Sequence, residues 1–341
     1  MFKALHLKVR RRIRRGLNAV SVWRDLPRRL ALMEGLLDVL FKSVQEHRLE
    51  SRLVWGQLTL PDKDLWNGHP VRVDGSPGQS VFPMSSPCRQ DSFRQPYFSF
   101  WTTRLDEGLR YHRKIWEFVF ICQALWERHA IRPGARGLGF GVGGEPLSAY
   151  FASEGCSVVA TDMEIERALE MGWTLSNEHA AGKETLRRPV ICPNDLFDAN
   201  VTFRTCDMNA IPDDLTDFDF CWSACALEHL GSIEKGLAFI ERSILCLKPG
   251  GWAVHTTEYN FSSNLETVDN MDTVLLRRRD FELLVQRLTA LGYRVAPLNF
   301  DIGDEPLDRY LDLMPYRDQP HLKMALWGFG VTSFGVIVQR C

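Results

Sequence analysis

The second half of the chain alternates short apolar runs with amphipathic stretches. The apolar runs have strand-like patterns near residues 135–140, 156–161, 200–205, 217–222, 251–257, 293–299 and 331–339. Helical periodicity falls at residues 146–154, 164–180, 233–246 and 280–291. Strands and helices in alternation predict an α/β fold, with a mostly parallel sheet covered by helices on both faces. The end differs, because two strands follow the last helix, with a polar, lid-like loop at residues 301–321 between them.

The first 60 residues are expected to form a polar, basic helical extension. Its apolar residues are spaced alternately four and three positions apart: Leu26, Leu30, Met33, Leu37, Leu40 and Val44. This heptad spacing is typical of a coiled-coil seam. It predicts either self-association through residues 26–44 or an amphipathic helix that packs on the rest of the chain.

Prolines separate this extension from the α/β region. Six fall within residues 61–96, at positions 61, 70, 77, 83, 87 and 96. Helices and central strands exclude proline at this density, so residues 61–96 are expected to be a linker or an irregular cap. Helical patterning returns at residues 97–131, and residues 97–341 are expected to form one α/β domain.

The charge of the chain is unevenly distributed. The formal net charge is −2, yet residues 1–30 hold ten Lys or Arg residues and one acid, Asp25. The remaining residues hold 31 bases and 42 acids. An acidic body without a basic groove argues against a dedicated nucleic-acid-binding protein. The basic segment, with arginines at positions 10, 11, 12, 14 and 15, is expected either to contact an anionic membrane surface or to remain solvated.

The cysteine and hydropathy patterns indicate the cellular compartment in which the protein is expected. The nine cysteines form no CxxC pair, which excludes a zinc cluster or disulfide framework and favours reduced thiols in a reducing compartment. No run of 18 apolar residues predicts a membrane span, and no apolar segment typical of a secretory signal follows the basic start. A cytoplasmic protein is expected, either membrane-peripheral through the basic segment or not. An organelle transit peptide is the alternative for this Arg-rich, acid-poor start.

A glycine-rich loop, residues 137–144, lies between the first predicted strand of the domain and a helix that begins near Pro146. Gly139, Gly141 and Gly143 alternate within it. Glycine lets the backbone turn tightly and approach a ligand, and the N–H groups at the start of the helix then face that ligand. Such loops bind nucleotides and dinucleotides. The absence of a following Gly-Lys-Ser/Thr excludes a P-loop.

Acidic residues follow the next two strands. Asp162 stands nineteen residues after Gly143, at the end of the second strand. A carboxylate there can accept both hydroxyls of a ribose. Asp207 follows the third strand and can accept from an exocyclic adenine amine, with Met208 packed on the ring.

In these features the sequence resembles the class I S-adenosylmethionine-dependent methyltransferases. The matching pieces occur in order across residues 112–340: Gly139-x-Gly141-x-Gly143, Asp162, Asp207, Glu228-His229 and Leu247-Lys248-Pro249-Gly250-Gly251. The resemblance implies a Rossmann-like, seven-stranded sheet whose last strand is antiparallel. It also implies S-adenosyl-L-methionine as the cofactor, bound by Gly139, Gly141, Gly143, Glu145, Asp162, Asp207, Met208 and Ser223.

One position departs from the family pattern. An acidic residue usually stands two positions before the first loop glycine and contacts the methionine part of the cofactor, and here that residue is Gly137. Glu145 is expected to take over this role, and Arg113 or Lys114 to pair with the methionyl carboxylate. Surface charge is the alternative for all three. A dehydrogenase, the competing use of this fold, prefers Gly-x-Gly-x-x-Gly, and the Lys-Pro-Gly-Gly turn favours the methyltransferase.

Methyl transfer needs an aligned acceptor and often a group that removes a proton. Candidates follow the fourth and fifth strands: His229, His255 and Glu258. Strand alternation puts His255 and Glu258 on opposite sides. Histidine suits a base because it titrates near neutrality, although His229 could instead hold the loop after the fourth strand. No metal set is predicted, because the spacing of Glu258, Asp272 and His321 is not diagnostic.

The sequence thus predicts a methyltransferase that acts by O-methylation on a small molecule or a glycan. Residues 145–147 and 255–258 are loosely similar to bacterial methyltransferases of surface-polysaccharide assembly. The alternative is a methyltransferase-like binding or scaffold protein without catalytic activity. The missing acid at Gly137 is the only indication for that alternative.

Overall fold

The computed structural model describes residues 33, 35–37, 40, 43, 75–78, 84–164 and 179–341. Contacts divide the chain into two units, Met1–Leu60 and Pro61–Cys341. In the first unit the described residues are helical, and Met33, Leu37 and Leu40 are more than half exposed. The rest of the predicted seam lies outside the described residues, as does most of the helix predicted at 164–180. Among the described helices, none is long and apolar enough to cross a membrane.

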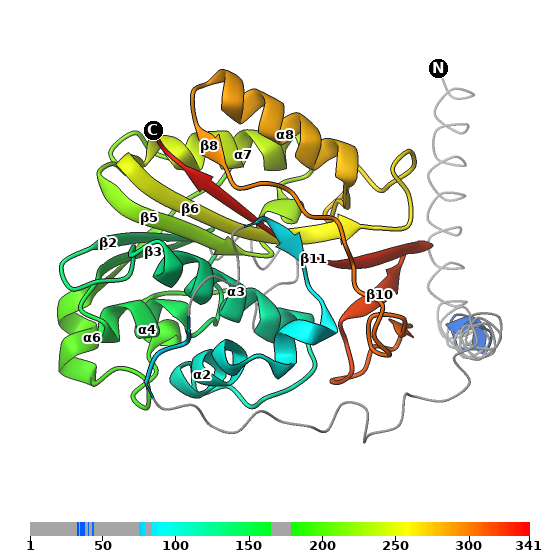
Figure 1. The fold of residues 1–341 in the computed structure, drawn as a ribbon, viewed down its shortest axis with the longest axis horizontal. Helices are drawn as coiled ribbons and strands as arrows, with labels where there is room; N and C mark the ends of the chain where they lie inside the picture. Colours follow the sequence, from blue (N-terminus) through cyan, green and yellow to red (C-terminus); the bar gives the residue numbers. More distant parts are fainter. Residues whose placement is uncertain are drawn as a thin grey trace, which may run out of the picture. The chain divides into compact units, whose positions relative to one another are not determined.

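One mixed sheet forms the centre of the second unit (Figure 1). Its strand order is β4-β3-β2-β5-β6-β11-β10-β9. Three short strands lie off this path: β1 and β8 pair with β11, and β7 pairs with β6. The strands are β1 (Ser86–Pro87), β2 (Arg136–Phe140), β3 (Ser157–Asp162), β4 (Val201–Thr205), β5 (Phe218–Ala224), β6 (Leu247–Asn260), β7 (Leu276–Arg277), β8 (Arg294–Val295), β9 (Leu311–Asp312), β10 (Lys323–Leu326) and β11 (Phe329–Gln339). Strands β2 to β6 are parallel, and β11 runs antiparallel to β6. The predicted Rossmann-like sheet with an antiparallel last strand is therefore confirmed.

The strand count differs from the seven expected. Of the strand predicted at 293–299, only the two residues of β8 form a strand, which pairs with β11. Pro297 has no N–H to donate, so it cannot continue that ladder. Its carbonyl instead accepts from the N–H of Ser85 at 2.9 Å. The predicted loop at 301–321 contains β9, which pairs with β10 at the far edge.

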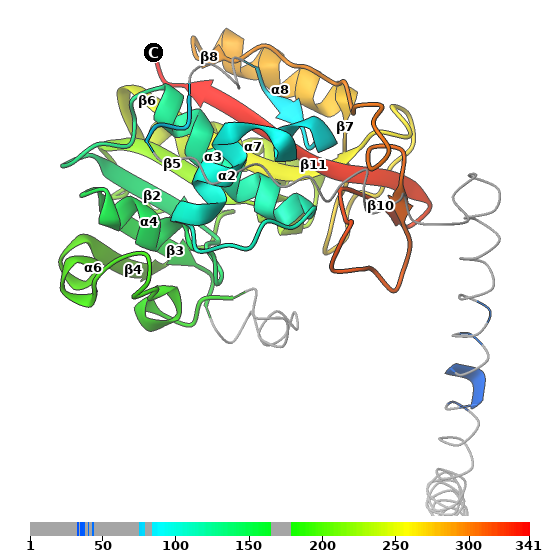
Figure 2. The same ribbon diagram turned by 60° about the horizontal axis from the view of Figure 1, so that its bottom comes forward.

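Helices cover both faces of the sheet (Figure 2). They are α2 (Pro96–Arg104), α3 (Arg113–Glu127), α4 (Leu147–Ser153), α6 (Asn194–Asn200), α7 (Ile233–Leu245) and α8 (Arg278–Ala290), with short 3-10 turns η2 (Gln90–Arg94), η3 (Lys183–Leu186) and η4 (Leu227–His229). Side chains alternate along β5. Phe220 and Trp222 join the core under α2, α3 and α4, whereas Cys221 joins the core under α7 and α8.

Residues 84–96, which the prolines assign to a linker or a cap, pack against this sheet. Ser86 and Pro87 pair with β11. The backbone N–H of Gln90 donates to Asp308 at 2.9 Å, and Asp308 forms a buried ion pair with Lys323 at 3.2 Å. The segment is thus part of the folded body of the second unit.

Helix α3 crosses β11 at a glycine. A Cβ built on Gly335 would overlap the ring of Phe120, which is fully buried. The missing side chain lets the helix approach the sheet closely. This approach matters for the site, because the first turn of α3 carries two of its cations.

We expect Gly335→Ala to destabilise the second unit by about 1–3 kcal/mol, the usual penalty for overpacking a core. Urea unfolding of the full chain measures this as a lower midpoint. Phe120→Leu in the same chain should recover part of the loss, because it removes the overlapping ring atoms. Gly108→Ala is the matched control, since no atom lies within 4 Å of its Cβ position. A Gly335→Ala midpoint equal to that of the parent would contradict the packing described.

Candidate functional site

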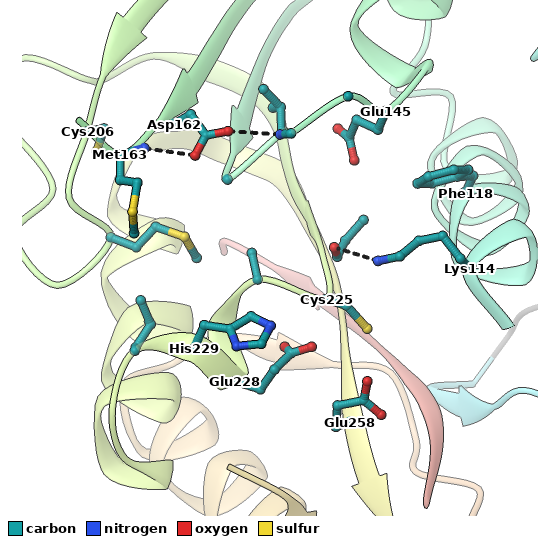
Figure 3. A pocket seen from close by; sticks show the side chains of 18 of the residues that line it. Lys114, Phe118, Glu145, Asp162, Met163, Cys206, Cys225, Glu228, His229 and Glu258 are labelled. Carbon is teal, nitrogen blue, oxygen red and sulfur yellow. Dashed lines mark hydrogen bonds between the residues drawn. The ribbon is translucent and has the colours of Figure 1, made fainter. Parts of the chain in front are cut away.

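A cavity of about 440 Å³ opens at the carboxyl ends of the parallel strands (Figure 3). Its lining includes the glycine loop at 141–146, Asp162 and Met163 at the end of β3, residues 206–209 after β4, and residues from 224 to 230 at the end of β5 and beyond it. The first turn of α3 and Glu258 of β6 also line it. Open α/β sheets bind ligands at this edge. The volume lies in the range of about 300–1,000 Å³ that is typical of small-molecule pockets.

The glycine loop has two kinds of glycine. Gly141 and Gly143 line the cavity and have positive φ angles of 56° and 50°, a backbone conformation that other residues rarely adopt. Gly139, predicted to contact the cofactor, lies within β2 and does not line the cavity. A Cβ there would come within 2.5 Å of the Trp222 ring, and a Cβ on Gly137 would come equally close to the Phe220 ring. These two glycines make room for aromatic side chains of β5, which leaves no space for an acidic residue at position 137.

Asp162 lines the cavity and also holds its wall. Its Oδ2 accepts from the backbone N–H groups of Gly143 at 2.9 Å and Ala180 at 3.0 Å, and its Oδ1 accepts from Met163 at 2.8 Å. Burial raises the pKa of this carboxyl despite these donors. A carboxylate has about four acceptor sites, so three are used and one is left for a ligand hydroxyl. Asp207 and Met208 line the same end of the cavity.

Glu145 points into the cavity from the loop (Figure 3). Its carboxyl accepts from Trp222 Nε1 at 2.5 Å, and burial raises its pKa to about 8. The Trp222 indole, which fills the space over Gly139, therefore also positions Glu145. Glu145 is the acid predicted to replace the one missing at position 137. Lys114 approaches from α3 and donates to the carbonyl of Ala224 at 3.3 Å.

A fully buried carboxylate, Glu117, organises the opposite wall. It lies 3.0 Å from Lys114 Nζ and 3.4 Å from Arg113 Nη1, and it accepts from Ser333 Oγ at 2.6 Å. The Cys225 thiol donates to it at 3.0 Å. Burial alone would raise the pKa of Glu117, but Lys114 and Arg113 outweigh burial and hold that pKa at about 2.

Three potential ligands converge beside this carboxylate. The side-chain ligand atoms of Cys225, Glu228 and Glu258 all lie within 4.8 Å of one another. Glu258 forms an ion pair with Arg113 at 2.6 Å, and Glu228 accepts from Thr257 Oγ1 at 3.1 Å. Burial raises the pKa of Glu258 to about 7 in spite of Arg113, and the charge of Glu228 adds to this effect.

His255 does not reach the cavity, which corrects the prediction that it faces the acceptor. It is fully buried, with Nδ1 2.9 Å from Ser223 Oγ and Nε2 3.0 Å from Ser243 Oγ. Burial lowers its pKa to about 3. Strand alternation turns Glu258 into the cavity and His255 toward α7. Ser223, predicted to bind the cofactor, is used in this buried bond and does not line the cavity either.

His229 lines the cavity and also holds its loop. Its Nδ1 lies 3.0 Å from the carbonyl oxygen of Asp272. A carbonyl only accepts, so Nδ1 carries a proton and donates it. Asp272 thus contacts His229 through its main-chain carbonyl and not through its carboxylate. His321, the other residue considered for a metal site, pairs with Asp312 at 2.8 Å. Neither of these two side chains lines the cavity among the described residues.

Two residues of the site, Glu117 and Cys225, had no role assigned from the sequence. A signal existed for Glu117, because an acid within the most apolar helical run must be paired. Cys225 offered no signal apart from its place after the fourth strand. Its partners come from α3 and β6, more than 30 positions away in the sequence.

Part of this chain is similar to known proteins. Residues 138–255, which run from β2 into β6, match a family model described as a methyltransferase domain. Among solved structures, the chain is similar to an S-adenosylmethionine-dependent methyltransferase from Mesorhizobium loti, with 15% identity over 64% of this chain and 98% of that chain and a TM-score of 0.39. A second such methyltransferase, from Aquifex aeolicus, has 17% identity over 64% of this chain and 88% of that chain and a TM-score of 0.34. A search of curated proteins finds no match.

The family match includes the glycine loop, Asp162, Asp207 and the Glu228-His229 pair. The fold places all of these around one cavity at the ligand-binding edge of the sheet. Residues 138–255 therefore belong to a methyltransferase domain, and the sequence motifs that line the cavity predict S-adenosylmethionine as its cofactor.

Proposed function

We propose that this domain transfers a methyl group from S-adenosylmethionine to a hydroxyl of a small molecule or a glycan. The observation that carries the proposal is the continuity of the cavity, which runs from Asp207 and Met208 at one end to Glu258 at the other. Cofactor and acceptor can then meet inside one cavity, as an in-line displacement requires. The acidic body of the chain supports a small acceptor over a nucleic acid.

We assign the cofactor to the end lined by the glycine loop. Asp162 would accept from the ribose and Asp207 from the adenine amine, and Met208 would pack on the ring, because all three line this end of the cavity. The N–H groups of the loop, with Gly141 and Gly143 at its turns, would face the cofactor directly. Gly139 and Ser223 were also predicted to bind the cofactor, but both lie outside the cavity and are not part of the proposed cofactor site.

Opposite charges favour one orientation of the methionine part. Its ammonium would lie against Glu145, and its carboxylate against Lys114. Both side chains line the cavity. The methyl group would then point toward the end that holds Glu228, His229 and Glu258.

We place the acceptor hydroxyl at that end, between Glu258 and His229. Because His229 donates through Nδ1 to a carbonyl, its Nε2 has the lone pair that can accept a proton. Glu258, fixed by Arg113, anchors the acceptor side. The net reaction moves the methyl from sulfur to oxygen and the hydroxyl proton to His229.

The basic segment, residues 1–30, is proposed to act apart from methyl transfer. Its ten basic residues and single acid favour contact with anionic membrane surfaces, at about 1 kcal/mol per charge. Deletion of residues 1–30 is expected to leave the affinity for S-adenosylmethionine unchanged and to reduce co-sedimentation with anionic lipid vesicles. Equal co-sedimentation of both chains would contradict the membrane contact, and lost cofactor affinity would contradict the division of roles.

Cofactor binding is expected to release a proton from Glu145. At pH 6.5 this carboxyl is mostly protonated because burial raises its pKa to about 8, whereas an adjacent ammonium favours the carboxylate. Calorimetric titration with S-adenosylmethionine in two buffers of different ionisation enthalpy should give different heats. Glu145→Gln should bind with equal heats in both.

Two results would count against these assignments. Equal heats for the unaltered chain would remove Glu145 from the cofactor site. No binding at millimolar cofactor would overturn the transferase and favour the inactive scaffold.

His229→Gln is expected to lower methyl transfer by about 10²–10⁴-fold because it removes the proton acceptor, and Glu258→Gln to lower it because the acceptor loses its anchor. Both should leave cofactor affinity within about twofold. The assay follows labelled methyl transfer to a panel of sugars and small alcohols. His255→Asn is the matched control, because it alters a polar residue of the same strand outside the cavity, with thermal unfolding used to confirm folding. Unchanged transfer by Glu258→Gln would reject its role.

A further inference from the structure

We infer that Cys225, Glu228 and Glu258 form a binding site for one divalent transition-metal cation at the acceptor end of the cavity. The cation's use in catalysis rests on the proposed function, but its binding does not. The three residues come from different elements: Cys225 follows β5, Glu228 lies in η4, and Glu258 lies in β6. Their ligand atoms lie within 4.8 Å of one another, and their side chains converge in Figure 3.

In both Glu228 and Glu258, one carboxylate oxygen has a polar partner and the other has none, as expected of metal ligands. One oxygen of each is held by a neighbour: Glu258 Oε1 by Arg113 at 2.6 Å, and Glu228 Oε2 by Thr257 at 3.1 Å. The other oxygens, Glu258 Oε2 and Glu228 Oε1, are buried and have no hydrogen-bond partner among the described residues. Metal-ligating carboxylates are oriented by outer hydrogen bonds in this manner.

Buried acceptors without partners are rare and unfavourable. Glu228 is 0% exposed and Glu258 4%, so solvent reaches neither side chain freely. A cation between the two unpartnered oxygens would satisfy both at once. This observation is independent of the clustering of the three ligand atoms.

The charge balance leaves room for a cation. Three acids, Glu117, Glu228 and Glu258, face two cations, Arg113 and Lys114. Glu117 contacts both cations, and Arg113 also contacts Glu258. The described groups of this cluster therefore have one uncompensated negative charge when the acids are ionised.

Binding would include the thiol of Cys225. The thiol now donates to Glu117 at 3.0 Å, so the step forms one metal–sulfur bond, breaks the S–H bond and releases that proton to solvent. One thiolate and two carboxylates favour the zinc, cobalt and iron(II) class over magnesium. Three protein ligands also leave a coordination position open. An acceptor hydroxyl at that position would lose its proton more readily.

The test uses the full chain, stripped with a chelator and titrated with Co²⁺ without cofactor. One equivalent should bind and produce a thiolate-to-cobalt charge-transfer band in the near ultraviolet. Cys225→Ser should abolish the band, and Glu228→Gln and Glu258→Gln should each weaken binding at least tenfold. Thermal unfolding of each variant checks that it folds.

Two matched controls are available in the same chain. Glu107→Gln alters a carboxyl group that lines the cavity outside the cluster, and Cys341→Ser removes an exposed cysteine. Both should retain the band and the affinity.

The inference is overturned by absence of stoichiometric binding, or by a band that persists in Cys225→Ser. S-adenosylmethionine binding, measured separately, distinguishes the two proposals. Cofactor binding without cobalt binding rejects only the metal site, whereas cobalt binding without cofactor binding rejects only the transferase function.

Discussion

The site depends on one buried carboxylate. Glu117 lies in the middle of an apolar helix, fully excluded from solvent, and its oxygens meet donors from three other places: Cys225 after β5, Thr256 on β6 and Ser333 on β11. A buried charge is tolerated only when its environment compensates it. Helix α3 and three strand segments must therefore be in register for this acid to be stable. The same register brings Arg113 and Lys114 to the edge of the cavity.

A second constraint explains the unusual start of the glycine loop. Phe220 and Trp222 occupy the space over Gly137 and Gly139. Aromatic rings in this layer add to the core under α4, where Phe151 packs against both. The same Trp222 indole donates a hydrogen bond to Glu145, the acid proposed to contact the cofactor in place of one at position 137. Core packing and the position of a polar group in the cavity are thus coupled through one side chain.

Periodicity alone could predict most of the layers. The alternation of apolar runs located β2 to β6 and β11, as well as α4, α7 and α8, because each buries one or both faces along a regular repeat. It could not predict β9, β10 or the reduction of the strand at 293–299, since these depend on pairing with β11 and on Pro297. The short α6 was also not predicted.

The site divides in a similar way. The spacing of the motifs located Asp162, Asp207 and Gly143. Each directly follows a predicted parallel strand, and ligands bind at the edge where such strands end. Alternation could separate His255 from Glu258, but it could not say which of the two faces the cavity. That choice depends on α7, whose Ser243 holds the histidine. Cys225 could not be assigned, since its neighbours come from distant parts of the chain.

The position of β11 has a consequence for biosynthesis. In chain order this strand comes after every strand it pairs with, namely β1, β6, β8 and β10. It also supplies Ser333, which donates to Glu117. Earlier segments can form the parallel half of the sheet during translation, whereas the wall that holds Arg113 needs β11. Until β11 has been synthesised, the nascent protein would present an open edge on β6, and edges of this kind promote association with other chains.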